Sequence, residues 1–166
     1  MSRPQSNAAC SPISRILVTI GALFISPLPA HGLDVNSFRA QHKLPPLTYS
    51  SAYAGAAQAH ANDLARRDHL DHNGFRQRVA AIGSRAAENV AYIQCPRARA
   101  AVQPAFGGLF GGGGGAGCAS ADAAYRMWAR SAGHRANMLM HGITSYGLAD
   151  AVSASGKHYW VLELGN

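Results

Sequence analysis

The sequence has 166 residues, enough for one folded domain with short additional segments. Fifteen Lys and Arg against eight Asp and Glu give a formal net charge of +7, but the basic residues form no run, and lysine occurs only at Lys43 and Lys157. This pattern lacks the concentrated basic surface typical of nucleic-acid-binding proteins, so we expect no nucleic-acid partner.

Residues 1–32 have the pattern of a secretory signal peptide. Arg3 and Arg15 precede the apolar run 16–25, which is too short to span a bilayer. Small residues at Ala30 and Gly32 allow cleavage after Gly32. We therefore predict a mature domain at 33–166, secreted or periplasmic, with no transmembrane segment after signal removal. The alternative for the apolar run is an uncleaved N-terminal anchor or a buried core helix.

The first half of the predicted mature chain is helical. Asp34 can cap a short helix over 34–42, which ends before Pro45 because the residue preceding a proline avoids the helical region. The longest helix begins at Ser50 or Ser51 and ends near Arg67. Its apolar residues recur at helical spacing, and its many alanines permit close packing against a neighbour.

The second half changes from helices to strands. A short helix over 73–82 precedes a stretch at 88–93 that is either an extended edge or a loop, and helices follow at 120–130 and 135–140. Two strands, 146–152 and 158–164, flank a turn at 153–156. Helices first and antiparallel strands last predict an α+β layered fold.

A glycine-rich tract at 106–117 interrupts this pattern, and glycine disfavours regular structure, so we predict a loop. The tract lies between Cys95 and Cys118, the two cysteines that remain once Cys10 is lost with the signal peptide. An even pair in a secreted chain favours a Cys95–Cys118 disulfide, with free or metal-binding thiols as the alternative.

Most of the chemistry-bearing residues lie on either side of the tract. One stretch holds His72 and the pair Glu88-Asn89, and the other runs from Trp128 through Ser131 and His134 to Asn137. Neutral imidazole is a common zinc ligand, and a carboxylate completes or orients such a site. These residues are candidates for a binding, metal or catalytic cleft.

In their order these motifs resemble the CAP superfamily, the SCP-domain group of cysteine-rich secretory proteins, antigen 5 and pathogenesis-related proteins. The resemblance covers roughly residues 35–165 and is closest to the compact bacterial members. It also rests on the segments 36–39, 44–47 and 159–161. It implies an α-β-α sandwich with a small antiparallel sheet between helical layers, secretion, and a cleft formed by His72, Glu88 and His134.

Two positions depart from the family pattern. Ser131 stands where the eukaryotic branches carry a second glutamate, as it usually does in compact bacterial members, so the cleft has one acid fewer. Ala87 replaces the glycine that commonly precedes the Glu-Asn pair, and its methyl group is expected to tilt Glu88 slightly or to narrow the cleft. Asn89, Ser131 and Asn137 are the supporting residues of the cleft.

Three functions stay open at this stage. The first is a secreted, monomeric binding module for a small-molecule, lipid or envelope ligand, with a divalent cation such as zinc on His72, His134 and Glu88. The second is a metal-dependent hydrolase of peptides or esters, with Glu88 as the base. The third is an interaction protein with a vestigial cleft, in which the two histidines only bond Glu88. We assign no catalytic nucleophile, and the enzyme question stays open with binding favoured.

Overall fold

The computed structural model describes residues 32–95 and 118–166. Residues 1–31 of the predicted signal peptide and the glycine-rich tract at 106–117 lie outside the described residues. Among the described residues, no helix has both the length and the apolar character needed to cross a membrane.

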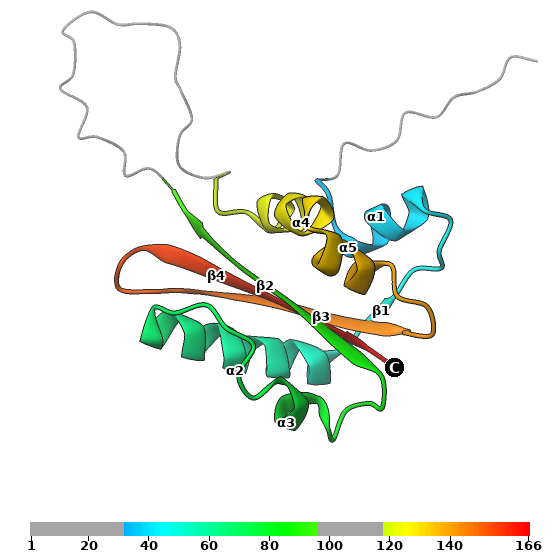
Figure 1. The fold of residues 1–166 in the computed structure, drawn as a ribbon, viewed down its shortest axis with the longest axis horizontal. Coiled ribbons are helices and arrows are strands. Elements are labelled where there is room, and N and C mark those ends of the chain that lie inside the picture. The colour runs from blue at the N-terminus through cyan, green and yellow to red at the C-terminus, as the bar shows by residue number, and fades with distance from the viewer. Residues whose placement is uncertain (1–31, 96–117) are drawn as a thin grey trace, which may run out of the picture. The chain divides into compact units, whose positions relative to one another are not determined.

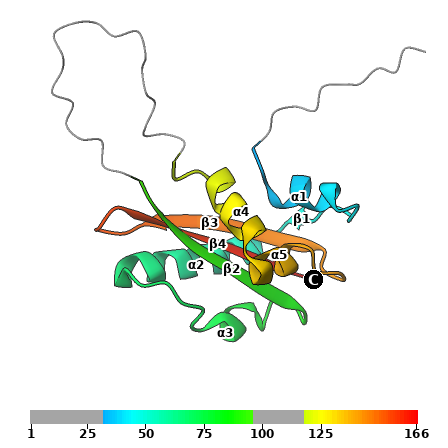
Figure 2. The same ribbon diagram turned by 45° about the horizontal axis from the view of Figure 1, so that its top comes forward.

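The described chain forms three layers with a four-stranded sheet in the middle. Helices α2 (Ser51–Arg67) and α3 (Phe75–Val79) cover one face, and α1 (Val35–Gln41), α4 (Ala121–Arg130) and α5 (Ala132–Met138) cover the other (Figures 1 and 2). This arrangement confirms the predicted α+β fold with a sheet between helical layers.

The sheet has the strand order β1-β3-β4-β2. Its strands are β1 (Thr48–Tyr49), β2 (Ala86–Gln94), β3 (Ser145–Val152) and β4 (Lys157–Gly165). The three long strands pair antiparallel, as predicted, but β1 pairs parallel with β3, so the sheet is mixed. The reason is local: Thr48 and Ser50 donate their N–H groups to the carbonyls of Thr144 and Tyr146, which adds a two-residue strand at the edge.

The predicted helix starts agree with the structure. Asp34 caps α1 through bonds from the N–H groups of Asn36 and Ser37, and Ser50 accepts a bond from the N–H of Tyr53 at the start of α2. Helix α3 is shorter than the predicted 73–82. The stretch predicted as an edge or a loop is the nine-residue strand β2 at the sheet edge.

Each helical layer buries its own apolar core against the sheet. Trp128, fully buried, belongs to the core on the α4 side, and Leu64 of α2 belongs to the core on the other side. Helix α2 approaches β3 most closely at Gly147, where any side chain would overlap the main chain of Tyr53 and Ala54. Close packing of the alanine-rich helix therefore depends on a residue without a side chain in the sheet.

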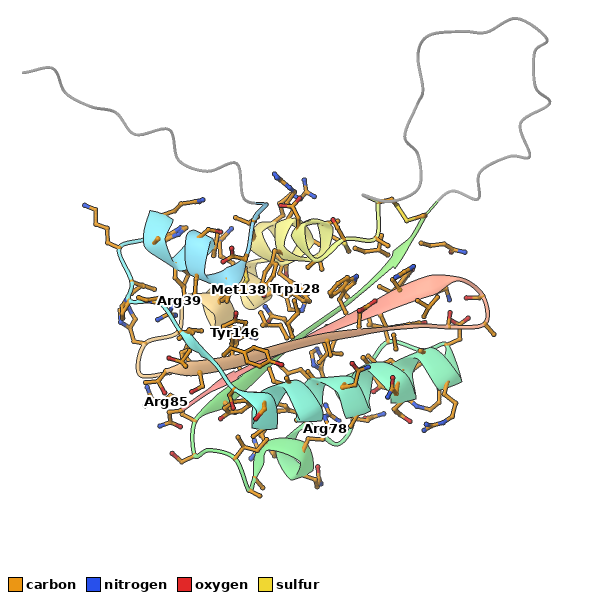
Figure 3. All side chains as sticks on the ribbon, turned by 180° about the vertical axis from the view of Figure 1, so that it is seen from behind. Arg39, Arg78, Arg85, Trp128, Met138 and Tyr146 are labelled. Carbon is orange, nitrogen blue, oxygen red and sulfur yellow. A yellow bond between two sulfur atoms is a disulfide. The ribbon has the colours of Figure 1, made fainter. Side chains whose placement is uncertain are left out.

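Arg39 connects α1 to α5 although it is almost completely buried. Its guanidinium donates to the carbonyl oxygens of Pro45 (2.9 Å), Met138 (3.0 Å) and Met140 (3.1 Å). Figure 3 shows Arg39 close to Met138, and Arg78 on the opposite side of the sheet. The positive charge thus lies on carbonyls at the C-terminal end of α5, where the helix dipole favours a cation.

The predicted disulfide is confirmed. Cys95 and Cys118 are bonded, with their Cα atoms 5.8 Å apart. The bond joins the residue after β2 to the segment that leads into α4, so it holds together the two parts of the chain that carry the candidate site.

Candidate functional site

Strand β2 divides the site between the two faces of the sheet. Successive side chains of a strand point to opposite faces. Val90 belongs to the core beneath α2 and Ala91 to the core beneath α4, so Glu88 shares the α2 face and Asn89 the α4 and α5 face. Because β2 is an edge strand, groups from both faces meet around its open side.

Glu88 is the buried centre of the α2-side cluster. Its side chain is 1% exposed, and its Oε1 atom lies 2.7 Å from Nδ1 of His72. Arg78 of α3 bonds the other carboxylate oxygen. The ring of His60 on α2 lies 3.8 Å from Oε1 while donating from Nε2 to the carbonyl of Asp71 (2.9 Å). Glu88 therefore meets one permanent cation and one imidazole at hydrogen-bonding distance.

Glu163 of β4 lies directly opposite Glu88 in the strand register and is also fully buried. Among the described residues neither of its oxygens has a hydrogen-bond donor, and Nε of Arg78 lies 3.6 Å away. Burial, followed by the adjacent Glu88 carboxylate, raises the pKa of Glu163 to about 9. Glu163 is therefore protonated at neutral pH, and Arg78 balances the charge of Glu88.

His134 and two amides form the α5 side of the site. Asn89 donates to the carbonyl of His134 (3.0 Å), and Asn137 donates to Oδ1 of Asn89 (2.9 Å) and to the carbonyl of Glu88 (3.3 Å). Both amides thus satisfy backbone groups. Burial, and then the nearby His72, lower the pKa of His134, so this imidazole stays neutral to a lower pH than an ordinary histidine.

A cleft of about 510 Å³ lies between these two clusters. Five of the six residues predicted from the sequence line it: His72, Glu88, Ser131, His134 and Asn137. Asn89 is buried beside the cleft, where it holds His134 and Asn137. Ser131 stands at the start of α5.

Residues 34–164 match the family described as "CAP: Cysteine-rich secretory protein family". The chain belongs to the CAP family. The resemblance found in the sequence motifs is therefore confirmed. A search of curated proteins gives no significant match.

Three solved structures share the CAP fold with this chain. An outer surface protein of Borrelia burgdorferi aligns with a TM-score of 0.58 at 14% identity, over 82% of this chain and 97% of its own. An extracellular protein of Bacillus anthracis str. Ames that contains an SCP domain aligns at 0.56 and 21% identity, over 80% and 37%. A cysteine-rich secretory protein of Staphylococcus aureus aligns at 0.52 and 16% identity, over 79% and 35%. The chain thus spans little more than a third of the latter two proteins.

The geometry of this CAP domain bears on the predicted metal site. No group of three or more His, Cys, Asp or Glu in residues 32–95 and 118–166 is placed to hold a metal ion. A cation placed directly on Glu88 would meet the guanidinium of Arg78 on the same carboxylate. The donors left are Nε2 of His72 and the ring of His134, which both line the cleft, and Glu88 orients the ring of His72. Zinc on the full set of His72, His134 and Glu88 stays a prediction.

Sequence reasoning missed three members of the α2-side cluster around Glu88: His60, Arg78 and Glu163. Pairing the stretch 88–93 with the strand 158–164 would have brought Glu163 opposite Glu88. A lone histidine on the apolar face of a helix indicates a core role, which leaves His60 unmarked, and the sequence offers no signal for Arg78.

Proposed function

We propose that this CAP-family protein is a secreted binding module whose cleft recognises its ligand through the imidazoles of His72 and His134. The observation that supports this proposal is that the His72 ring is both fixed in position and exposed to solvent. Its Nδ1 is fixed on a buried carboxylate, yet its side chain is 53% exposed. A histidine that served only to hold helices against the sheet would gain nothing from this exposure, whereas a ligand-binding ring requires it.

The surroundings of Glu88 favour binding over hydrolysis. A general base needs a carboxylate that can accept a proton from a substrate or from water. Both oxygens of Glu88 are engaged, by His72 and Arg78, and the side chain is closed to solvent. Glu88 is therefore suited to orient His72, as carboxylates commonly do behind ligand-binding histidines.

A divalent cation would be held by His72 and His134. When bound, it would supply a positive charge that attracts an anionic group of the ligand. Glu88 fixes the ring of His72 through Nδ1, and Asn89 holds the main chain of His134.

Secretion is supported by three observations. The chain carries a signal-like segment at 1–32, and its disulfide is of the kind that persists in oxidising compartments. Two of the structurally similar proteins are described as extracellular or outer-surface proteins. A small-molecule, lipid or envelope component outside the cytoplasm is the expected ligand class.

Zinc titration by calorimetry tests the role of the two rings. We expect the oxidised, metal-free protein to bind zinc at micromolar or lower concentrations, and His72→Ala and His134→Ala to lose this binding while remaining folded. His141→Ala, which removes an exposed histidine, is the matched control. Affinity should fall sharply below about pH 6, because imidazole must be neutral to ligate. Binding that is indifferent to both substitutions would remove the cation from the proposal and direct the search to uncharged ligands.

A further inference from the structure

The outer edge of β2 carries main-chain groups that point away from the sheet. Asn166 donates its N–H to the carbonyl of Arg85 (3.2 Å), which places residue 85 in a hydrogen-bonded pair at the start of the β2–β4 ladder. Hydrogen-bonded and non-hydrogen-bonded pairs alternate along an antiparallel ladder. The main-chain N–H and C=O groups of residues 87, 89, 91 and 93 therefore bond β4, whereas those of residues 88, 90 and 92 point away from the sheet. The bond from Asn137 to the carbonyl of Glu88, on the outer side, agrees with this alternation.

Two outward-facing residues, Val90 and Tyr92, have no main-chain partner within the described part of the chain. The side chain of Asn137 bonds the outward carbonyl of Glu88, so the unpaired part of the edge begins after this residue. No hydrogen bond from residues 32–95 or 118–166 reaches the outward N–H or C=O groups of Val90 and Tyr92. Proteins usually cover or shorten such an edge because it pairs readily with another chain. A short, specific stretch of β2 is therefore available for strand pairing.

A groove of about 510 Å³ runs along this stretch of edge. Val90, Ala91 and Tyr92 line it from β2, Leu70 from the segment after α2, and Met127 from α4. The two helical layers thus flank the groove on either side of the sheet edge. Among the described residues, Tyr92 and Met127 are two of the few large apolar side chains that remain exposed, at 45% and 42%.

The groove is continuous with the cleft. Ser131 and His134 line both, so a ligand lying along β2 reaches the imidazoles without crossing a barrier. Glu88 is buried and paired with Arg78, and the cleft therefore presents no free negative charge to its ligand. With the cation of the proposed function on His134 and His72, an acidic group is the complementary occupant for this end of the groove.

We propose that the groove binds an extended peptide, which adds a fifth strand along β2 and places an acidic side chain at His134. Main-chain bonds to Val90 and Tyr92 supply the pairing, as in other strand-addition complexes. The peptide residue opposite Ala91 shares its face with Trp128, so it is apolar and packs against Met127 and Trp128. The residue opposite Asn89 lies two positions along, about 7 Å away, on the face of His134, and it is acidic.

Main-chain hydrogen bonding is what favours a peptide over an acyl chain. A hydrocarbon in the groove would leave the polar groups of Val90 and Tyr92 without partners, which costs free energy when water is displaced. A peptide satisfies them. The acidic side chain of the peptide rests on the proposed function of His72 and His134, whereas the strand pairing does not.

Amide hydrogen exchange tests the pairing directly. The probe is the capped peptide acetyl-Thr-Val-Leu-Thr-Asp-Thr-amide, added to the isotope-labelled, oxidised full chain. We expect the amides of Val90 and Tyr92 to exchange much faster than those of Asn89 and Ala91 in the free protein, and to slow at least tenfold with peptide. Slow exchange at Val90 and Tyr92 in the free protein would show that the chain already covers this edge, and would overturn the proposal.

Variants at Tyr92 separate pairing from simple apolar contact. Proline is tolerated on an edge strand where the N–H faces outward, so Tyr92→Pro removes one donor without breaking the bonds to β4. Tyr92→Ala removes the ring and keeps the donor. We expect Tyr92→Pro to bind the peptide about two- to tenfold more weakly than Tyr92→Ala, the effect of one hydrogen bond. Equal affinities would overturn strand pairing.

Changes to the groove and the probe complete the test. Met127→Asp should abolish binding, while Val152→Asp, which alters an apolar residue of similar exposure on β3, should not. With zinc present, replacing aspartate by asparagine in the peptide should weaken binding. If it does not, yet Val90 and Tyr92 are still protected, the role of the imidazoles fails and the strand pairing stands. If decanoate binds in the groove and the peptide slows amide exchange at neither Val90 nor Tyr92, the proposal is overturned in favour of a lipid ligand.

Discussion

The carboxyl groups of Glu88 and Glu163 face each other across neighbouring strands, and Arg78 lies against both. One guanidinium balances one carboxylate, so the second carboxyl group keeps its proton. As a protonated acid, Glu163 can donate to Glu88, which would satisfy an otherwise unpartnered buried group. The charge state of this one residue therefore determines whether the cluster beneath His72 is neutral.

Glu163→Gln should change how stability depends on pH. Burial raises the pKa of Glu163 to about 9 in the folded protein, above its ordinary value of 4.5. The stability contributed by the protonated group is complete below about pH 4.5 and is lost as pH rises through about 9. The neutral glutamine has no proton to lose. We expect urea unfolding from pH 5 to 9.5 to show the wild-type free energy of unfolding falling relative to that of Glu163→Gln. Parallel curves would contradict a protonated Glu163.

His72, Glu88 and His134 were predictable at the residue scale because each belongs to a short motif that can be read without knowing the fold. Arg78 and Glu163 belong to none. Glu163 joins the site only through the register of β2 on β4, and Arg78 only because α3 packs beside β2. The charge balance of the site is a tertiary property, so the sequence alone did not predict the ion pair between Glu88 and Arg78.

Helix α2 and strand β3 pack closely against each other. The alanine-rich face of α2 lies against the sheet, and Gly147 of β3 leaves the space that the main chain of Tyr53 and Ala54 occupies. A glycine inside a strand often marks such a close approach of another backbone. The spacing between the helix and the sheet is therefore set by one residue in the strand.

Gly147→Ala should destabilise the fold by about 3 kcal/mol, because the new methyl group overlaps main-chain atoms that cannot move independently of α2. Gly55→Ala is the matched control: Gly55 lies in α2 with open space around it, and alanine should stabilise the helix by up to about 1 kcal/mol. Chemical denaturation of both variants measures the two effects. A Gly147→Ala protein as stable as Gly55→Ala would contradict the close packing.

The elements that the sequence predicted well are those with a clear local pattern. Helices α1 and α2 have a capping residue, and β3 and β4 flank a turn. Strand β1 could not be predicted, since two residues form no pattern and their bonds come from β3. Strand β2 stayed ambiguous because residues 87–91 are buried in succession, so no alternation distinguishes it from a loop.

For the whole molecule, the Cys95–Cys118 disulfide links the two halves of the site-bearing chain across a sequence separation of 23 residues. Loop closure on this scale stabilises a fold by about 3 kcal/mol. We expect the double variant Cys95→Ser and Cys118→Ser to lose about that much, measured by urea denaturation under oxidising conditions. The parent protein measured after reduction of the disulfide is the control and should lose a similar free energy. A double variant as stable as the parent would contradict a stabilising role for the bond.

The contacts of Arg39 also constrain the order in which parts of this chain can fold. Its carbonyl partners on Met138 and Met140 lie 99 and 101 residues further along the chain. Strand β2 likewise finds its only described partner in β4, which comprises the last nine strand residues, Lys157–Gly165. A chain that emerges N-terminus first, from a ribosome or a secretion channel, can make the Arg39 contacts only after residue 140 is free, and the β2–β4 pairing only after β4 is free. A chain cut before residue 157 therefore lacks the strand that pairs with β2, and its sheet stays open beside the cleft.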